Sequence, residues 1–515
     1  MKKKIADVAF ICIFMAMISV PALLLNVRPH VESAQENRML TEWPGLGFDS
    51  RINEWYGHYL EDRVGFRRQA ITAYTKLMYG AFGAFAEDLH MSGKDGYVFP
   101  ADEGYIGAYQ HLRTDEDLIG DFAHYLKNTS MYLEQKGIPF VFMAGLDKKT
   151  VYPEYMPDSI HVDAGQKSII ESLTQHLKEA GVPYVIPVEE YMQAKQNDQI
   201  YNRKYDCAHW NDLGKMIAIR LADEELKRQG LDMPAIREED YALSYELRPQ
   251  LEFVEVRIDE EVPVYHLKQQ PTLWDDPDLT ENMWLVDGTS VQYYSNSNAL
   301  KKKRILIFHD SFLQDAKEFY CARYSQVFFV SRQNYECVQY YVNLIRPDAV
   351  VFENAERAFV DDLYAYTNLA AIRYEPPYES FGKLQKGEDK PFGLRLTGAE
   401  NASYGAESLS KEGGIPVRLD TAGSYFTFRG EVRLPEDMES DELYLYGVYK
   451  KKKYEISYPA LQKGQPGVIG RKGAVLPFYM SLRKEKKPEG KIRIILVDGR
   501  EGKQYTVGEL NLYTD

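Results

Sequence analysis

The chain has 515 residues and a formal net charge of −15, from 62 basic and 77 acidic side chains. This length is sufficient for two or three domains, each with its own hydrophobic core. Hydrophobic residues make up 44% of the sequence, which is typical of a globular protein and excludes a wholly disordered one. The negative charge disfavours nucleic acid as a partner, because a polyanion would be repelled.

The amino terminus has the pattern of an export segment. Three lysines at positions 2–4 precede the uncharged stretch Val8–Leu25, which is just long enough to cross a hydrocarbon core as a helix. Basic residues at that end stay in the cytoplasm, so the rest of the chain is placed outside. We expect residues 1–27 to be a transmembrane signal anchor of a single-pass cell-membrane protein. A cleaved signal peptide is the alternative.

We interpret residues 28–380 as one domain, in which helical and strand patterns alternate from about Asp115. Helices show apolar residues at spacings of three and four, whereas buried strands show short continuous apolar runs. The predicted helices are Asp49–Gly83, Asp115–Gln135, Ala164–Ala180 and Trp210–Gln229. The predicted strands are Ile138–Gly145, Val182–Val188, Arg304–Asp310, Gln326–Val330 and Asp348–Asn354. This alternation predicts an α/β fold with a doubly wound parallel sheet, whose functional groups gather at the carboxyl ends of the strands.

Two regions depart from that alternation. Tyr241–Lys303 contains alternating segments such as Phe253–Asp259, so residues 241–303 are predicted to be an insertion. Beyond Pro376 the apolar pattern changes to a period of two. The predicted strands there are Tyr425–Leu434, Glu442–Tyr449, Tyr454–Tyr458, Lys491–Gly499 and Tyr505–Tyr513. They indicate a C-terminal antiparallel β-sandwich at residues 385–515.

Three residues form a candidate catalytic set. Asp206 and His209 stand three positions apart in the loop before Trp210. Ser311 follows the predicted strand Arg304–Asp310 where a helix is expected to begin, so that amide groups of the helix could stabilise an oxyanion. A histidine can accept the serine proton while an aspartate orients its ring. We therefore expect His209 Nε2 within hydrogen-bond reach of Ser311 Oγ, and Asp206 at the other ring nitrogen.

A specific resemblance strengthens this interpretation. Six motifs occur in order: Leu60–Arg67, Gly93–Phe99, Asp147–Pro157, Asp206–Asp212, Asn298–Phe312 and Arg346–Arg357. In these motifs the chain resembles the AlgX/AlgJ alginate O-acetyltransferases and the related DHHW proteins of bacterial cell surfaces. That family has an SGNH-hydrolase-like fold with a permuted motif order, in which the Asp-His motif precedes the serine. The resemblance implies that residues 28–380 form a catalytic domain with an acetyl-Ser311 intermediate.

Two features depart from the family pattern. The family spaces its aspartate and histidine as DxHW, whereas a cysteine and an alanine separate Asp206 from His209 here. This DxxH spacing is that of ordinary SGNH enzymes, so the geometry is expected to survive. His309 replaces the glycine of the GDS serine motif. Its side chain either crowds the approach to Ser311 or contributes to the pocket.

Five residues are candidates for substrate binding. Lys148 matches a lysine of the family, while Tyr152 and Trp210 could stack on a sugar ring. Arg332 follows a predicted strand and could contact an anion or oxyanion, and His309 lies beside the nucleophile. The structural alternatives are a solvated lysine for Lys148, aromatic packing in the core for Trp210 and a surface salt bridge for Arg332.

Two further interpretations concern structure alone. A metal site at Asp206 and His209 would need another ligand, and the remaining histidines form no ligand-spaced cluster, so no metal is expected. The adjacent pair Glu356 and Arg357 is interpreted as structural.

These observations predict an extracytoplasmic enzyme without a cofactor. The resemblance implies transfer of an acetyl group to a hydroxyl of a cell-surface polysaccharide. Since acetyl-CoA is not available outside the membrane, it also implies a membrane-bound O-acyltransferase partner as acetyl donor. The C-terminal sandwich could bind carbohydrate. A carbohydrate O-acetylesterase with water as acceptor and a non-catalytic polysaccharide-binding surface protein remain as alternatives.

Overall fold

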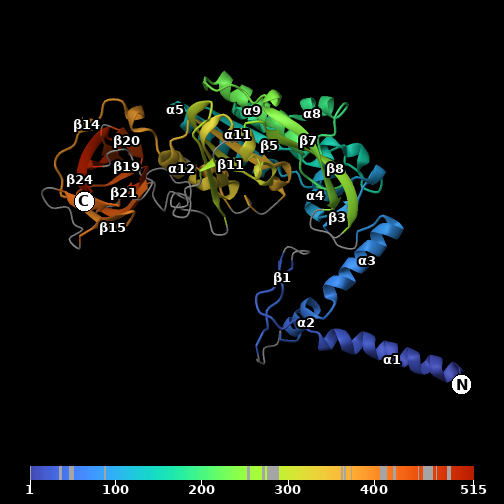
Figure 1. Cartoon of the computed structure of the whole chain (residues 1–515). Coiled ribbons are helices and arrows are strands. Elements are labelled where there is room, and N and C mark those ends of the chain that lie inside the picture. Colours follow the sequence, from blue (N-terminus) through green and yellow to red (C-terminus); the bar gives the residue numbers. More distant parts are fainter. Residues whose placement is uncertain are drawn as a thin grey trace.

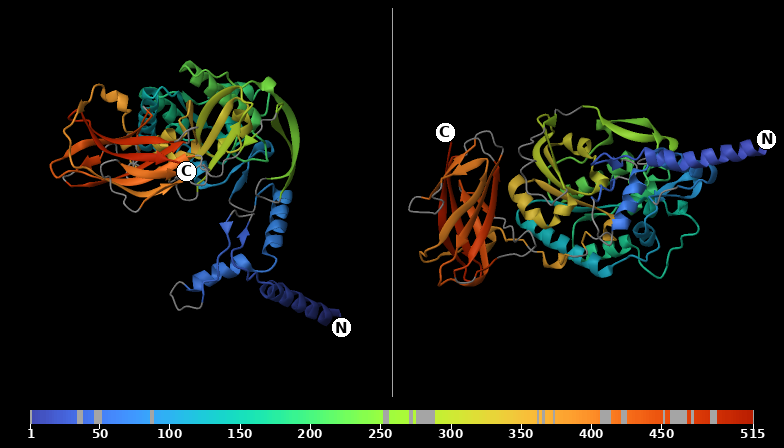
Figure 2. Two further views of the ribbon diagram at one scale, coloured as in Figure 1. Left: turned by 60° about the vertical axis from the view of Figure 1, so that its left-hand side comes forward. Right: turned by 90° about the horizontal axis from the view of Figure 1, so that it is seen from below.

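The computed structural model describes residues 2–33, 38–45, 52–85, 89–251, 256–269, 273–274, 289–360, 363–364, 367–372, 374–405, 414–420, 425–450, 452–455, 468–470, 473–483 and 489–514. Figure 1 shows a group of N-terminal helices, a central α/β part and a β-rich C-terminal part. The two views in Figure 2 place the β-rich part and the N-terminal helix at opposite sides of the α/β part.

The described residues of the N-terminal part include three helices. They are α1 (Lys2–Leu23), α2 (Ile52–Arg63) and α3 (Arg67–Phe82). The sequence predicts one helix over Asp49–Gly83, but the structure breaks it between α2 and α3. Phe66 adopts a left-handed conformation there, with φ of 61°. A left-handed residue cannot continue a right-handed helix, so the chain changes direction at that point.

The predicted membrane anchor is not supported by the structure. The sequence predicts a crossing at Val8–Leu25, but α1 ends at Leu23 and contains Pro21. Among the residues that the structure describes, no helix is long and apolar enough to cross a membrane.

A seven-stranded sheet forms the centre of the α/β part, in the order β6-β5-β13-β11-β12-β10-β9 (Figure 1). Its parallel strands are β5 (Phe140–Gly145), β6 (Tyr184–Val185), β11 (Lys301–His309), β12 (Tyr324–Ser331) and β13 (Ala349–Ala355). Two antiparallel strands extend one edge, namely β9 (Leu273–Trp274) and β10 (Val291–Asn296). The predicted α/β class with a parallel sheet is thus confirmed, with an antiparallel edge that the sequence does not predict.

Helices cover both faces of this sheet, which explains why its strands are apolar throughout. The described helices of the α/β part are α4 (Glu103–Tyr109), α5 (Glu116–Gln135), α6 (Lys148–Val151), α7 (Ile169–Ala180), α8 (Val188–Ala194), α9 (Asp212–Arg228), α11 (Lys317–Cys321) and α12 (Val338–Ile345), of which α5, α9, α11 and α12 contact strands of the sheet. Helix α9 contacts β5 and β6, and α11 contacts β10 and β12.

Aromatic rings on one face show how the core is built. Phe142, Phe352 and Phe308 lie in register across β5, β13 and β11. Phe122 of α5 packs edge-on against Phe142 at a centroid distance of 5.7 Å. Tyr341 of α12 packs edge-on against Phe308 at 5.8 Å. These contacts tie three neighbouring strands to two helices and make the sheet a rigid base for residues at its carboxyl edge.

Helix boundaries follow local chemistry. Helix α7 begins at a capping box in which Ser168 and Glu171 exchange hydrogen bonds, so the predicted start at Ala164 is too early. Gly181 caps its C-terminal end in a left-handed conformation, with φ of 71°, which glycine adopts without strain. Strand β6 is much shorter than the predicted Val182–Val188. A proline cannot donate a ladder hydrogen bond, and the sequence places prolines at positions 183 and 187.

The predicted insertion has two parts. Strands β7 (Tyr241–Gln250) and β8 (Arg257–Leu267) form a separate antiparallel hairpin. The later strands β9 and β10 pair into the main sheet, so the end of 241–303 is not an excursion. Part of the predicted strand Phe253–Asp259 lies outside the described residues, since the structure describes none of residues 252–255.

The C-terminal part consists of two sheets packed face to face. The larger contains β14 (Gln385–Lys386), β16 (Ala402–Tyr404), β17 (Ile415–Leu419), β19 (Ser440–Tyr449), β20 (Lys452–Glu455), β21 (Val468–Gly470), β23 (Gly490–Asp498) and β24 (Lys503–Tyr513). The smaller contains β15 (Gly393–Glu400), β18 (Tyr425–Arg433) and β22 (Val475–Arg483). Residues of both sheets form one core, which includes Phe428 and Ile494. Among the strands described in this part of the chain, pairing is antiparallel except at β14–β24 and β17–β24.

Candidate active site

The candidate nucleophile lies at the carboxyl edge of the main sheet. Strand β11 ends at His309, and Ser311 is the first residue of a single 3-10 turn, η4 (Ser311–Leu313). The expected longer helix does not begin here, because α11 starts only at Lys317. The Ser311 backbone N–H donates to Asp310 Oδ1 at 2.8 Å. The prediction that helix amides beside this serine stabilise an oxyanion is therefore not supported.

Ser311, His209 and Asp206 have the contacts that the sequence predicts. His209 Nε2 lies 2.9 Å from Ser311 Oγ. On the other side of the ring, His209 Nδ1 lies 2.9 Å from Asp206 Oδ2. A carboxylate only accepts hydrogen bonds, so Nδ1 carries the proton and the Nε2 lone pair faces the serine. This arrangement can deprotonate Ser311 as it attacks a carbonyl carbon.

Hydrogen bonds within the loop stabilise the conformation of the segment that contains Asp206 and His209. Asp206 Oδ1 accepts hydrogen bonds from the backbone N–H groups of Ala208 at 2.8 Å and His209 at 2.9 Å. Burial alone would raise the pKa of the Asp206 carboxyl, but the His209 side chain and these two N–H groups lower it below its ordinary value. The Asp206 side chain is therefore an anion at neutral pH and orients the imidazole.

Lys148 supports that loop and does not face a pocket. Its side chain is fully buried, and Nζ donates to the backbone oxygens of Val98, at 2.9 Å, and Asp206. The backbone N–H of Lys148 donates to Ala208 O at 3.1 Å. Burial lowers the pKa of Lys148 to about 8. The prediction of direct substrate binding by Lys148 is thus not supported, because its ammonium group is used to position the Asp206 loop.

The hairpin β7–β8 holds the residues just before Asp206. The Glu260 carboxylate on β8 accepts hydrogen bonds from the backbone N–H groups of Arg203 at 2.6 Å, Lys204 at 2.8 Å and Tyr205 at 2.7 Å. Three donors on one carboxylate fix the path of the chain into Asp206. The insertion therefore contributes to the site although it lies outside the main sheet.

Two aromatic residues predicted to stack on sugar belong to the core. Trp210 is 4% exposed, and its Nε1–H donates to Phe312 O at 2.9 Å. Tyr152 is also 4% exposed and accepts a hydrogen bond from Ile200 N at 3.3 Å. Their rings are buried, so the structure supports the core-packing alternative for Trp210 and places Tyr152 in the core as well. The hydrogen bond from Trp210 also links the segment that contains His209 to the turn that contains Ser311.

Phe312 packs at the centre of the site. Its ring centroid lies 4.7 Å from that of His209 and 4.9 Å from that of Trp210. Gly145 at the end of β5 makes this packing possible, since a Cβ there would lie 2.6 Å from a ring carbon of Phe312. A side chain at this position would push the nucleophile turn away from β5.

Asp310 holds the turn that contains Ser311 through contacts of its side chain and its backbone. Its Oδ2 forms an ion pair with Arg332 Nε at 2.6 Å. Its backbone N–H donates to Glu353 Oε2 at 2.7 Å. Burial and the negative charge of Asp310 raise the pKa of the Glu353 carboxyl well above its ordinary value, so that Glu353 is neutral. Arg332 therefore neutralises Asp310 in a salt bridge that is buried and not on the surface, while also lining the pocket beside Ser311.

A pocket of about 270 Å³ lies beside Ser311. Its lining includes His309, Arg332, Gln292, Gln314 and Gln333. His309 therefore contributes to the pocket, as one of its two alternatives predicts. Its Nδ1 lies 2.9 Å from Asp310 O, and a carbonyl only accepts, so Nδ1 donates. Burial lowers the pKa of His309, which favours the neutral imidazole.

Arg357 belongs to the site, although the sequence alone suggested a structural role for it. Its Nη2 lies 3.0 Å from His209 Nε2, the atom that also faces Ser311. The same guanidinium pairs through Nη1 with Asp147, whose side chain is fully buried. A signal was present in the sequence, since Arg357 closely follows the predicted strand Asp348–Asn354, and strand ends gather functional groups.

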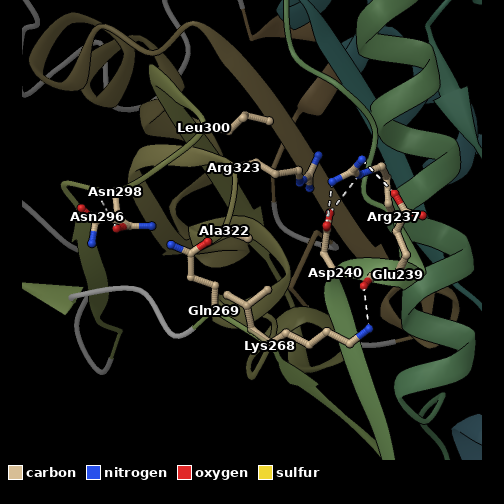
Figure 3. Close-up of a pocket in the computed structure, with 11 residues that line it drawn as sticks. Arg237, Glu239, Asp240, Lys268, Gln269, Asn296, Asn298, Leu300, Ala322 and Arg323 are labelled. Carbon is tan, nitrogen blue, oxygen red and sulfur yellow. Dashed lines mark hydrogen bonds and ion pairs between the residues drawn. The ribbon is translucent and has the colours of Figure 1, made fainter.

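A second pocket, of about 330 Å³, lies at the opposite edge of the sheet (Figure 3). Ala322 and Arg323 in its wall precede β12, whereas Ser311 follows the parallel strand β11. Its basic groups are engaged, because Arg237 pairs with Asp240 and Arg323 with Asp223. This pocket is therefore separate from the candidate catalytic residues.

A comparison with protein families gives one match. Residues 91–248 match the family described as the SGNH hydrolase-like domain of acetyltransferase AlgX. The matched segment contains Asp206 and His209 and ends before Ser311. The resemblance to AlgX that the motifs predict is confirmed over this segment. No curated protein sequence matches the chain.

Solved structures with a similar arrangement include three bacterial proteins. Bacillus cereus PatB1 is 14% identical, with a TM-score of 0.41 over 54% of this chain and 99% of that chain. The O-acetyltransferase domain of Pseudomonas putida AlgJ is 16% identical, with a TM-score of 0.36 over 53% and 92%. A DHHW family protein from Eubacterium siraeum is 14% identical, with a TM-score of 0.39 over 54% and 95%.

Proposed function

We propose that the protein is an O-acetyltransferase that acetylates hydroxyl groups of a bacterial cell-surface polysaccharide through an acetyl-Ser311 intermediate. The observation that supports this most directly is the chain of contacts from Asp206 through His209 to Ser311. The relation of residues 91–248 to the AlgX acetyltransferase domain supports acyl transfer as the reaction class.

The first half of the reaction forms the acetyl-enzyme. Ser311 Oγ attacks the carbonyl carbon of an acetyl ester while its proton moves to His209 Nε2. The carbonyl π electrons move to oxygen, giving a tetrahedral oxyanion. When this intermediate collapses, the donor oxygen leaves and takes the proton from Nε2. Asp206 stabilises the imidazolium throughout and does not itself become protonated.

The second half repeats these steps with a sugar hydroxyl. His209 Nε2 accepts the proton of the hydroxyl as its oxygen attacks the acetyl carbon of acetyl-Ser311. Collapse then expels Ser311 Oγ, which recovers the proton from Nε2. The products are the acetylated sugar and the free enzyme, so protons and acetyl groups balance over the cycle.

The partners and the location belong to the same proposal. A membrane-bound O-acyltransferase would supply the acetyl group, and the catalytic domain would lie on the extracytoplasmic side. In the sequence, the lysines at positions 2–4 and the apolar run after them support this location. The C-terminal sandwich would hold the polysaccharide. Protease treatment of intact cells, which degrades only exposed domains, tests the location.

A carbohydrate O-acetylesterase is the second candidate, and one observation favours it. Ser311 is exposed, and 27% of the His209 side-chain surface is accessible. Water could therefore reach the acetyl-enzyme and take the place of the sugar hydroxyl. The chemistry of the three residues is the same in both reactions, so the acceptor alone distinguishes them.

An activated ester tests the role of the three residues. We expect p-nitrophenyl acetate to give a burst of p-nitrophenol as Ser311 is acetylated. Ser311→Ala should abolish the burst and His209→Ala should slow it by several orders of magnitude, whereas the loss in Asp206→Asn should be about 10²-fold smaller than in His209→Ala. Ser325→Ala, in β12 and outside the site, is the matched control and should retain the full burst.

Adding an acceptor oligosaccharide separates the two candidate activities. A transferase should move acetyl to the sugar, which mass spectrometry of the oligosaccharide detects. An esterase should release mainly free acetate under the same conditions. A folded wild-type protein that reacts no faster than Ser311→Ala would instead support a non-catalytic polysaccharide-binding protein.

A further inference from the structure

The usual oxyanion donor at a serine nucleophile is engaged elsewhere in this protein. The Ser311 backbone N–H donates to Asp310 Oδ1 at 2.8 Å. Asp310 is itself held by Arg332 at 2.6 Å and accepts from Ala355 N at 3.3 Å. Because these contacts fix the Asp310 carboxylate, the Ser311 N–H is directed toward it in the resting enzyme. Negative charge that develops on an acetyl group at Ser311 therefore needs another donor.

Arg357 has a donor at the reacting atoms. Its Nη2 lies 3.0 Å from His209 Nε2, which in turn lies 2.9 Å from Ser311 Oγ. A guanidinium has no acceptor, so Nη2–H donates to the Nε2 lone pair, which it shares with the Ser311 hydroxyl in the resting enzyme. The contact requires a neutral His209 with its proton on Nδ1, and Asp206 on that side imposes the same tautomer.

Neighbouring charges hold the Arg357 side chain in place. Its Nη1 pairs with Asp147, which is also 3.1 Å from Lys149 Nζ. Lys149 Nζ contacts Glu356 Oε1 at 2.6 Å, and Asp147, Lys149 and Glu356 are all buried. The guanidinium carbon lies 5.4 Å from the centroid of the Phe312 ring. Arg357 is thus anchored through one nitrogen while 21% of its side-chain surface stays accessible.

We propose that Arg357 is a catalytic residue whose Nη2–H stabilises the negative oxygen of the tetrahedral intermediate at Ser311. This inference rests on the proposed acyl-transfer function. As the Ser311 proton moves to Nε2, that nitrogen loses its lone pair and can no longer accept from Arg357. The donor is released at the same step in which negative charge forms on the carbonyl oxygen. Arg357 neither gains nor loses a proton.

Both functions of the side chain require an arginine. Nη1 serves the ion pair with Asp147, and Nη2 serves His209 and then the oxyanion. A lysine would keep the positive charge but has a single nitrogen, which cannot occupy both positions. Arg357→Lys should therefore retain part of the rate, and Arg357→Ala should lose more.

The test measures the acetylation rate of the full-length protein with p-nitrophenyl acetate. We expect Arg357→Ala to lower the rate constant of the burst about 10²–10³-fold with little change in KM, because the donor acts on the transition state. Guanidinium chloride at concentrations well below those that unfold the protein should restore part of this rate. Arg237→Ala, which removes an exposed arginine at the pocket in Figure 3, should change neither value.

Three outcomes would overturn the inference. These are a full burst rate in Arg357→Ala, a loss expressed only as a higher KM, or a loss that guanidinium does not restore although circular dichroism shows a folded protein. If the alanine variant does not fold, a full burst rate in Arg357→Lys would overturn it equally. Absence of a burst in the wild-type protein would instead reject the proposed function, so the two failures can be distinguished.

Discussion

Among single residues, Lys148 shows how a buried charge can serve a site without touching a ligand. Its ammonium group donates to the backbone oxygens of Val98 and Asp206. Carbonyl oxygens stabilise an ammonium group less than water does, and burial lowers the pKa of Lys148 from 10.5 to about 8. The protein thus accepts a cost in stability to hold the loop that carries Asp206 and His209.

This cost predicts a pH dependence of stability. Between pH 8 and 10.5 the unfolded chain keeps the Lys148 proton while the folded protein releases it. Unfolding free energy then rises with pH in that window, by at most about 1.4 kcal/mol per pH unit, and is independent of this group below it. We expect the unfolding free energy of the wild type to rise relative to that of Lys148→Met from pH 8 to 10.5 in urea titrations. Lys178→Met, on the exposed side of α7, controls for loss of a lysine, and a constant difference would contradict the expectation.

The sequence predicted some site residues and missed others for a physical reason. Asp206 and His209 are close in the chain, and Ser311 follows an apolar strand, so local patterns were sufficient to predict their contacts. The roles of Lys148 and Arg357 depend on partners that are distant in the chain, such as His209 and Arg357, which are 148 positions apart. A single sequence carries no record of such contacts.

Among the elements, the turn after β11 depends on the segment that enters α9. Trp210 Nε1–H donates to Phe312 O at 2.9 Å, and their ring centroids lie 4.9 Å apart. Asn211 caps α9 by accepting from Leu213 N at 3.0 Å. One short segment therefore supplies the base, a bond to the nucleophile turn and the start of a helix. This coupling keeps Ser311 and His209 at a fixed separation.

We expect Trp210→Phe to disturb that coupling. The variant keeps an aromatic ring but removes the donor to Phe312 O, and an unsatisfied buried carbonyl costs about 1–3 kcal/mol. Thermal unfolding should show the loss of stability, and the burst with p-nitrophenyl acetate should slow because Ser311 is less well placed. Trp43→Phe, in the N-terminal part, tests the same substitution away from the site and should keep the full burst rate. An unchanged rate in Trp210→Phe would show that the turn does not need this bond.

Element boundaries were predicted less well than element types. The parallel strands were recognisable because both of their faces are buried and their sequences are apolar throughout. The break at Phe66 was missed although Gly65 precedes it, since the left-handed conformation lies at Phe66, whose residue type does not indicate it. The pairing of β10 with β12 was also missed, because the register between segments remote in the chain is set by tertiary packing.

At the scale of the whole molecule, charge should govern which acceptors approach. The chain carries a net charge of −15. Within the described part of the site, each arginine near Ser311 has a carboxylate partner, with Arg332 paired to Asp310 and Arg357 to Asp147. The positive charge beside Ser311 is thus largely compensated. A neutral oligosaccharide meets no barrier from this field, whereas a uronate oligosaccharide is repelled.

Salt should reveal this difference. The Debye length falls from about 30 Å at 0.01 M salt to about 8 Å at 0.15 M, so added salt weakens long-range repulsion. We expect KM for a uronate oligosaccharide to fall as salt increases over this range, while KM for a neutral oligosaccharide of equal length stays constant. Acetyl transfer to each acceptor, followed by mass spectrometry, gives both values, and the burst with p-nitrophenyl acetate shows whether salt affects the nucleophile itself. A KM for the uronate that rises with salt would mean that attraction dominates, because a local basic surface then outweighs the negative field of the whole chain.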